Sequence, residues 1–362
     1  MDRRAFIKKA ALAGGTVAAT GLAAPVIAQG VMELKMVTSW PKSFPGLGTA
    51  AERFGARLEA ASGGRYVVKI FAGGELVPPL GCHDAVQDGT ADMYHSADYY
   101  YQSKSKGYAF FTSVPFGLRA DEMDAWILHG GGQELWDKLG ANFGIKHLPC
   151  GNTGAQMGGW FNRPIKSLDD FKGLKMRIPG LGGEVIRALG GTSVTLAGAE
   201  ILPALESGTV DAVEWVGPWG DLEFGFHNVV KNYYYPGFQE PGSMLGLGLS
   251  KKLWDGLSDA DKLMFETCAL AENNFDHAEH NARNLAALNV LINEHDVVLW
   301  EFPYEVFQGF GNAAKDVLAD AGNNDAMTKE IYESFLAFRR QAADWSRYSD
   351  QAYMNKRALV DF

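Results

Sequence analysis

Four polar residues stand where this sequence could do chemistry. They lie at the ends of predicted strands or in the extended runs between them, and they are Gln156, Arg177, Glu214 and Glu240. Together they offer one guanidinium, two carboxylates and an amide oxygen. This set can bind an organic anion or a hard cation, because such cations prefer oxygen donors.

Arg177 carries the strongest signal of the four. It lies in the apolar run 174–178, which predicts a strand buried on both faces. A buried guanidinium is costly unless it meets an anion, and its planar fork matches a carboxylate. The sequence therefore predicts either a bound carboxylate at Arg177 or a structural ion pair with Glu184 or Asp211.

A repeated phrase shows which elements position these residues. The segment 204–212 (ALESGTVDA) repeats the pattern of 85–93 (AVQDGTADM), and an apolar strand precedes each, at 67–72 and 175–178. Both copies predict a helix stopped by glycine and followed by a short buried strand. Two such units predict an α/β fold of two lobes, and ligands of these folds bind beyond the carboxyl ends of the strands.

Two glycine-rich extended runs, 148–162 and 244–250, predict strands that cross between the lobes and form a hinge. The expected boundaries are 29–157 with 246–302 for lobe I, 158–245 for lobe II, and 303–362 for C-terminal helices. A long helix is expected at 259–294, with Asp259 as its cap. The last helix carries an apolar seam, Met327, Ile331, Phe335, Phe338, Ala342 and Trp345. This seam packs either on its own globule or on another chain.

The N-terminus predicts export. Residues 1–28 combine a twin-arginine basic region with an Ala/Gly-rich apolar run and the small-residue site Val26–Ala28. Cleavage after Ala28 removes four basic residues and one acidic residue, so the net charge changes from −10 to −13. Such an acidic body argues against nucleic acid or an anionic membrane surface as partner. The three cysteines predict buried thiols and leave one disulfide open.

Motifs for other function classes are weak or missing. The sequence has no Gly-x-Ser-x-Gly elbow, P-loop, dinucleotide fingerprint or Cys-x-x-Cys pair. His277 and His280 stand one helical turn apart and could bind a metal, but a solvated helix face is the preferred interpretation. A secreted hydrolase and a metal chaperone are kept as alternatives of other classes.

The segments 172–179 (KGLKMRIP), 204–212 and 249–254 (LSKKLW) resemble the periplasmic solute receptors of tripartite ATP-independent (TRAP) transporters. The resemblance covers the whole mature chain. It implies a periplasmic-binding-protein-like fold of two lobes, with a long C-terminal helix, and a receptor that delivers its ligand to a membrane permease. The chain would therefore not be an enzyme.

Within that family, the segments 156–162 (QMGGWFN), 214–218 (EWVGP) and 239–241 (QEP) resemble the branch that binds 2-oxo acids or lactate together with a metal cation, Na⁺ or Ca²⁺. The resemblance implies that Arg177 grips the ligand carboxylate. Substrate contacts would also come from Gln156, Tyr99, Tyr100, Trp215 and Glu240. The cation would be surrounded by Gln156, Glu214, the Trp215 carbonyl and Glu240. The same branch implies a homodimer through the C-terminal helix. A receptor for another organic anion, without a cation, stays as the alternative.

Overall fold

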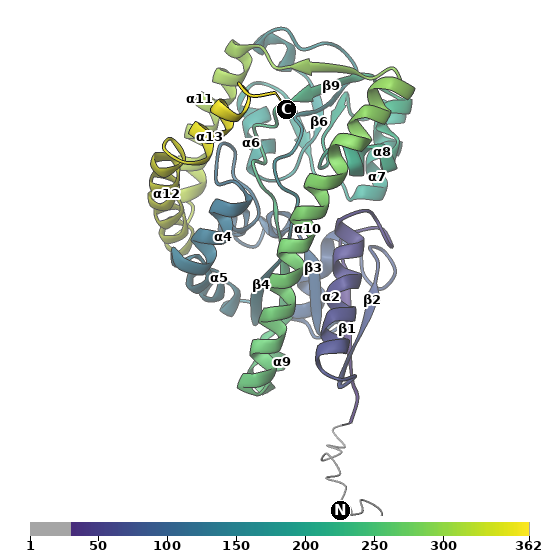
Figure 1. Ribbon diagram of the computed structural model, residues 1–362, viewed down its shortest axis with the longest axis vertical. Coiled ribbons are helices and arrows are strands. Elements are labelled where there is room, and N and C mark those ends of the chain that lie inside the picture. The colour runs from purple at the N-terminus through teal and green to yellow at the C-terminus, as the bar shows by residue number, and fades with distance from the viewer. Residues whose placement is uncertain (1–29, 362) are drawn as a thin grey trace, which may run out of the picture. The chain divides into compact units, whose positions relative to one another are not determined.

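The computed structural model describes residues 30–361, so the predicted export signal at 1–28 lies outside the described residues. Two mixed sheets form the centres of the two lobes (Figure 1). In spatial order, the first sheet contains β2 (Tyr66–Phe71), β1 (Met32–Thr38), β3 (Met93–Ser96), β10 (Met244–Ser250) and β4 (Ile145–Asn152). The second contains β7 (Thr192–Val194), β6 (Lys175–Arg177), β8 (Ala212–Val213), β5 (Gly159–Phe161), β9 (Asn232–Tyr235) and β11 (Val298–Glu301).

The two sheets repeat one pattern of pairing. In the first, β1 pairs in parallel with β2 and β3, and β10 runs antiparallel beside β3. In the second, β6 pairs in parallel with β7 and β8, and β5 runs antiparallel beside β8. The predicted two-lobe α/β fold is therefore confirmed. The repeat needs one correction: the predicted strand at 67–72 (β2) corresponds to β7, and β1 corresponds to the strand at 175–178 (β6).

The repeated segments 85–93 and 204–212 form the same local structure in both lobes. The glycines after α3 (Cys82–Gln87) and α7 (Gly198–Glu206), at 89 and 208, take φ values of 83° and 70°. The backbone N–H groups of Asp92 and Asp211 donate to the carbonyls of Lys35 and Lys175. Their carboxylates accept from the backbone N–H groups of the same lysines, at 2.7 and 3.0 Å. Each aspartate thus ties its strand to the neighbouring parallel strand.

Two extended segments cross between the lobes, and they are hydrogen-bonded to each other. One leads from β4 to β5 and the other from β9 to β10. Thr153 N–H donates to Ser243 O and Gln156 N–H to Glu240 O, both at 3.0 Å. The predicted crossing at 244–250 is instead β10, a strand within the first sheet. The predicted boundary at 302 does not follow the sheets, because β11 pairs with β9 in the second sheet.

The helix α10 (Asp259–Glu294) follows α9 (Lys251–Gly256) and packs on β4 and α2 (Leu47–Ala61) of the first lobe and on α8 (Pro218–Phe224) of the second (Figure 1). Its cap is Ser258, whose hydroxyl accepts from Asp261 N–H, and not Asp259 as predicted. The preferred interpretation of its histidine pair is also wrong, because His280 is buried against α2 and α8.

Further helices cover the sheets. They are α4 (Ala120–His129), α5 (Gly132–Ala141), α6 (Gly180–Ala188) and the short turns Pro79–Gly81, Asp98–Tyr101, Lys106–Phe111, Leu168–Phe171 and Phe226–Asn228. All three cysteines are free and buried, which confirms the prediction of buried thiols. Within residues 30–361, no helix is both long and apolar enough to span a bilayer.

The C-terminal part contains α11 (Tyr304–Gly322), α12 (Ala326–Ser346) and α13 (Asp350–Arg357). The apolar seam on α12 divides in two. Ile331 and Phe335 are buried on the short helix Lys106–Phe111 and on α4 and α5 of the same chain, whereas Trp345 is 69% exposed. Only the second half of the seam is therefore available to another chain.

Asp98 anchors the turn that carries Tyr99 and Tyr100, two of the predicted substrate contacts. It starts the turn Asp98–Tyr101 directly after β3, and it is fully buried. Its carboxylate accepts from Tyr94 Oη and Trp136 Nε1, both at 2.8 Å. These two bonds hold the first residue of the turn in place, and thereby help to fix the positions of Tyr99 and Tyr100.

Asp98 also predicts a pH dependence of folding. Burial raises its pKa from 3.8 to about 7, against the two hydrogen bonds, which lower it. A carboxyl with a raised folded-state pKa contributes stability at pH below its unfolded value, and this stability is lost as pH rises through about 7. The melting temperature of Asp98→Asn relative to the parent should therefore increase between about pH 5 and pH 8. The exposed Asp320→Asn serves as control, and a flat difference for Asp98→Asn would contradict the prediction.

Candidate functional site

The structure brings the four predicted polar residues into one buried region between the lobes. Arg177 ends β6, and Glu214 follows β8, its parallel neighbour. Gln156 and Glu240 lie on the two crossing segments, whose backbones are bonded at these residues. Their exposed fractions are only 1% for Arg177 and Glu214, 3% for Glu240 and 5% for Gln156. Because Arg177, Glu214 and Glu240 are all buried here, the interactions among their charges are not screened by water.

Arg177 forms an ion pair with Glu214, at 2.5 Å between Nη1 and Oε1. Nη1 also donates to Glu214 O at 2.8 Å, and both Nε and Nη2 donate to Leu196 O, at 3.2 and 3.0 Å. The alternative partners named from the sequence are wrong. Glu184 lies beside Lys106 and Arg187, and Asp211 binds the backbone of β6.

These contacts limit how Arg177 can hold a carboxylate. Protein acceptors occupy four of its five N–H groups, and the fifth, on Nη2, has only a long contact of 3.4 Å to Tyr100 Oη. A ligand carboxylate can reach Nη2 together with the Tyr100 hydroxyl, or it can displace Glu214 Oε1. A bidentate grip, which the sequence suggested, requires the second route.

The two glutamates share an excess of negative charge. Burial raises the pKa of Glu240 to about 7, although the neighbouring polar side chains of Ser243, Tyr99 and Gln156 and the charge of Arg177 oppose the rise. Burial also raises the pKa of Glu214 well above its usual value, with Arg177 opposing and Glu240 reinforcing the shift. One guanidinium cannot neutralise both carboxylates, so the site favours an added positive charge, either a proton or a cation.

Gln156, Glu214 and Glu240 each have a buried oxygen that finds no hydrogen-bond partner among residues 30–361: Gln156 Oε1, Glu214 Oε2 and Glu240 Oε2. An unsatisfied buried acceptor is costly, and such groups indicate a missing ion or water. All three are hard oxygen donors, which suit Na⁺ or Ca²⁺. The residues therefore fit the expected cation.

The histidine face offers less to a metal. His280 is 1% exposed, and its Nε2 lies 3.8 Å from Asp276 Oδ1 of the same helix. Burial lowers its pKa to about 3. Residues 30–361 contain no group of three or more His, Cys, Asp or Glu side chains that could hold a metal ion.

A narrow cavity adjoins the buried region. Its volume of about 10 Å³ is enough for about one water molecule. Its lining includes the predicted Tyr99, Tyr100, Gln156 and Trp215, and also Trp40, Leu47, Thr153, Val216, Ser243 and Leu245, which the sequence analysis did not name. Tyr101, by contrast, is buried against Tyr94 and Tyr108. The position of Trp40 just beyond the carboxyl end of β1 was a usable signal, because β1 corresponds to β6 in the repeat.

Asp221 of α8 is a supporting residue that the sequence analysis also missed. Its fully buried carboxylate accepts from Trp160 Nε1 at 2.9 Å, Tyr233 Oη at 2.7 Å and Val216 N–H at 3.3 Å. Because Val216 follows Glu214 and Trp215, this bond holds the turn that presents them. Burial raises the pKa of Asp221 to about 6.

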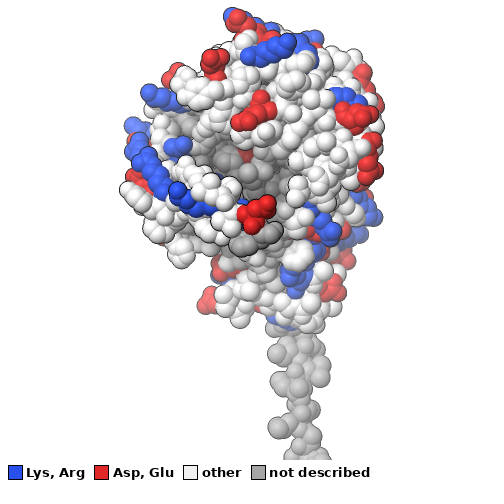
Figure 2. All heavy atoms as spheres, turned by 45° about the horizontal axis from the view of Figure 1, so that its top comes forward, with Lys and Arg blue, Asp and Glu red and all other residues white. Residues whose placement is uncertain are grey.

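In the view of Figure 2, Lys and Arg gather along the left side of a hollow whose walls are mainly uncharged, and Asp and Glu are scattered over the rest of that face.

Comparisons with known proteins place the chain in a family. The family model described as bacterial extracellular solute-binding protein, family 7, matches residues 36–325. A monocarboxylate 2-oxoacid-binding periplasmic protein of Nostoc sp. strain PCC 7120 is 40% identical over 98% of this chain and 98% of its own.

Two solved structures are similar over almost their full lengths. A TRAP periplasmic solute-binding protein from Pseudoalteromonas atlantica, with bound sodium and pyruvate, is 35% identical with a TM-score of 0.87, over 90% of this chain and 99% of that one. A TRAP solute-binding protein from Bordetella bronchiseptica is a mixed-occupancy dimer with calcium and picolinate. It is 34% identical with a TM-score of 0.89, over 91% of this chain and 98% of that one.

Proposed function

Because the chain belongs to family 7 of the bacterial extracellular solute-binding proteins, we propose that it is the periplasmic receptor of a TRAP transporter. It binds a small 2-oxo or 2-hydroxy monocarboxylate together with a metal cation and delivers the acid to a membrane permease. The family consists of receptors and not of enzymes, which favours this function over the secreted hydrolase.

The observation that carries the proposal is the set of unpartnered oxygens beside Arg177. With one guanidinium and two carboxylates, the protein contributes a net charge of −1 to the site, and a monocarboxylate adds another −1. Like charges in a buried region repel strongly. A cation on Gln156 Oε1, Glu214 Oε2 and Glu240 Oε2, with the Trp215 carbonyl as a further donor, relieves this repulsion and satisfies three unpaired acceptors.

The ligands of the two similar structures support a chelate. Pyruvate has its 2-oxo oxygen beside the carboxylate, and picolinate has its ring nitrogen in the same place. Either donor can close a five-membered ring on the cation with one carboxylate oxygen. We infer that this chain selects for a donor atom next to the carboxylate by the same chemistry, with no dedicated hydroxyl donor.

Arg177 has two roles in the proposed complex. It holds Glu214 Oε1 at 2.5 Å, so that Oε2 stays oriented toward the cation, and its Nη2 with the Tyr100 hydroxyl faces the ligand carboxylate. Tyr99 and Trp215 complete the pocket wall. Because the cavity is so narrow, admission of a three-carbon acid requires the lobes or the lining to open, as a hinge at the two crossings allows.

Replacement of Arg177 tests the carboxylate grip. Loss of a charged hydrogen-bond partner costs about 1.5–3 kcal/mol, so Arg177→Ala should weaken pyruvate binding about ten- to a hundredfold or more. Arg177→Lys should also bind poorly, because a point charge cannot copy the guanidinium fork. Affinity is measured by titration calorimetry in the presence of Ca²⁺.

Arg177→Ala also leaves Glu214 buried and unpaired, so its melting temperature must be measured in parallel. The double variant Arg177→Ala/Glu214→Gln removes that unpaired charge, and Arg187→Ala in α6 is the exposed-arginine control. Binding within about twofold of the parent by a folded Arg177→Ala would show that Arg177 is not the grip.

Removal of the cation tests the chelate. Protein treated with a chelator and kept in Na⁺-free buffer should bind pyruvate at least about tenfold more weakly, and added Ca²⁺ or Na⁺ should restore binding. Glu214→Gln should lose more affinity than Glu240→Gln, since Glu214 shares the cation site with the carbonyl of its neighbour. Glu184→Gln, outside the site, is the matched control.

Propionate is the matched control ligand, because it lacks only the 2-oxo oxygen of pyruvate. The chelate predicts that propionate binds far more weakly than pyruvate and gains nothing from the cation. Equal affinities, or full binding by the stripped protein, would favour the alternative receptor for an organic anion without a cation.

We further propose a homodimer through the C-terminal helices. The exposed large apolar residues of this region are Trp345, Tyr348, Tyr353, Met354, Leu359 and Val360. A cluster of this kind is typical of an interaction surface, and the similar Bordetella protein is a dimer. Because Ile331 and Phe335 are covered by their own chain, the contact uses the region from Trp345 onward.

Trp345→Glu should shift the intact protein toward the monomer, because it places a charge in the proposed contact. The control Lys329→Glu changes an exposed residue near the start of α12. The mass in solution at micromolar concentration, from light scattering, distinguishes the states. A monomeric mass for the parent protein would refute the dimer.

The periplasmic location completes the proposal. The twin-arginine pair, the apolar run and the site at Val26–Ala28 support export and cleavage after Ala28. The protein from a periplasmic fraction should therefore begin at Gln29. An N-terminal sequence that still contains Arg3 and Arg4 would contradict the cleavage.

A further inference from the structure

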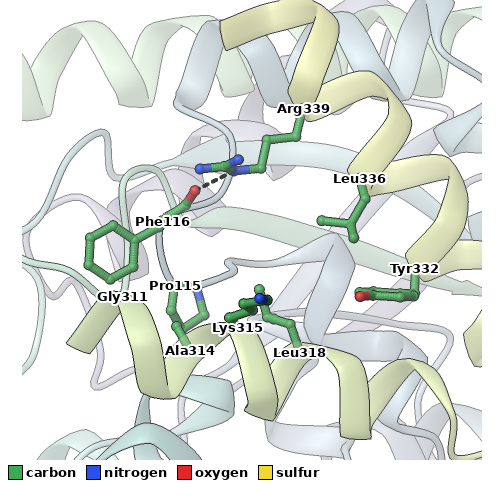
Figure 3. A pocket seen from close by; sticks show the side chains of 9 residues that line it. All are labelled: Pro115, Phe116, Gly311, Ala314, Lys315, Leu318, Tyr332, Leu336 and Arg339. Atoms are coloured by element: carbon green, nitrogen blue, oxygen red, sulfur yellow. Dashed lines mark hydrogen bonds between the residues drawn. The ribbon is translucent and has the colours of Figure 1, made fainter. Parts of the chain in front are cut away.

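A second cavity, here called the α11–α12 pocket, lies apart from the region of Arg177 and Glu214. It has a volume of about 190 Å³ and is lined by Pro115, Phe116, Gly311, Ala314, Lys315, Leu318, Tyr332, Leu336 and Arg339. In Figure 3, α11 supplies Gly311, Ala314, Lys315 and Leu318, α12 supplies Tyr332, Leu336 and Arg339, and the segment before α4 supplies Pro115 and Phe116. Nothing in the proposed receptor function uses it.

The pocket has the size and walls of a small-ligand site. Except for Lys315, Arg339 and the Tyr332 hydroxyl, its lining side chains are apolar. A cavity of about 150 Å³ between apolar side chains is enough for benzene. The α11–α12 pocket therefore has room for one ring, or for a branched chain of similar size, with a small polar group at the mouth.

The two cations of the pocket have no acidic partner. Within residues 30–361, no carboxylate lies within 4.0 Å of the charged nitrogens of Lys315 or Arg339. The acidic side chains that flank Arg339 along α12, Glu333 and Asp344, lie near other cations, at 3.9 Å from Lys329 and at 3.4 Å from Arg347. Arg339 Nε donates to Phe116 O at 2.5 Å (Figure 3), which leaves its two Nη groups without a protein acceptor. The exposed Lys315 of α11 and the half-buried Arg339 of α12 therefore both line this cavity without an acidic partner among the described residues.

The wall formed by Phe116 is held in a fixed and unusual shape. Phe116 has a φ of 55°, which is uncommon for a residue with a side chain. Its N–H donates to Phe238 O at 3.0 Å, and its carbonyl accepts the bond from Arg339. A strained residue fixed at both ends is a feature found at binding sites. The pocket is thus formed before any ligand arrives.

We propose that the α11–α12 pocket is an accessory binding site for a small amphipathic monocarboxylate, with an aromatic ring or a branched chain of similar size. The apolar part lies among Phe116, Leu318 and Leu336, and the carboxylate lies between Lys315 and the Nη groups of Arg339. The charge of the two cations selects an anion, and the volume excludes ligands much larger than one ring. This site is independent of the cation site and of Arg177.

Benzoate is the probe, and benzamide is its neutral isostere. Weak binding to the intact protein is measured by saturation-transfer NMR and equilibrium dialysis, with pyruvate and Ca²⁺ in excess so that the first site is filled. Benzoate should bind at concentrations up to about 10 mM, and benzamide at least about tenfold more weakly. Excess pyruvate should not displace benzoate, which separates this result from the success or failure of the proposed receptor function.

Two variants locate the site. Gly311→Leu fills the cavity, since a Cβ on Gly311 would lie 3.7 Å from the Phe116 ring, an ordinary contact, and leucine favours a helix over glycine. It should weaken benzoate binding at least about tenfold. Lys315→Glu should do the same through charge, whereas the exposed Lys252→Glu in α9 should leave binding within about twofold of the parent.

Pyruvate affinity should be unchanged in Gly311→Leu and Lys315→Glu, because neither residue touches the first site. Absence of benzoate binding, including by a dimer that covers the pocket, would overturn the proposal. Equal binding of benzamide would overturn it as well, and so would unchanged binding of benzoate by folded Gly311→Leu.

Discussion

The buried ion pair between Arg177 and Glu214 is the interaction on which the site depends. Removal of one partner from such a pair leaves an uncompensated charge and typically costs about 3–5 kcal/mol. The surroundings are built to keep this pair in place: Leu196 O fixes the guanidinium, and Asp221 holds the turn after Glu214. With Glu240 nearby, the pair also leaves one negative charge too many. The need for a cation thus follows from the architecture that orients the arginine.

Much of the fold was predictable because the two lobes repeat one local rule. Asp92 and Asp211 stand at the same place in the repeated phrase, and each ties its strand to a neighbour through one lysine backbone. Glycines that end helices and apolar runs that form buried strands are local signals, so they can be recognised in the sequence itself. Membership of the site followed from the same logic: residues at strand ends in a repeated α/β unit meet at one edge. Arg177 and Glu214 were predicted in this way, whereas Gln156 and Glu240 were predicted from the extended runs between the lobes.

What the sequence did not reveal depends on packing between distant segments. Glu214, 37 residues further along the chain, is the partner of Arg177 because Arg177 pairs in register with Val213. Without that register, Glu184 and Asp211 were equally reasonable partners. His280 was placed on the solvated side of its helix, yet α2 and α8 cover it. The division of the seam at Phe335 likewise depends on which helices lie beneath α12, which a helical period does not encode.

The helix α10 has a mechanical consequence for this architecture. Its 36 residues correspond to a rod of about 54 Å, and this rod touches both lobes. At His280, the imidazole lies 5.4 Å from the Trp219 ring of α8, and a Cβ on Gly46 would lie only 2.4 Å from its Nε2. Because one continuous helix packs on both lobes, a rotation of one lobe about the two crossings must also change how that lobe packs on α10.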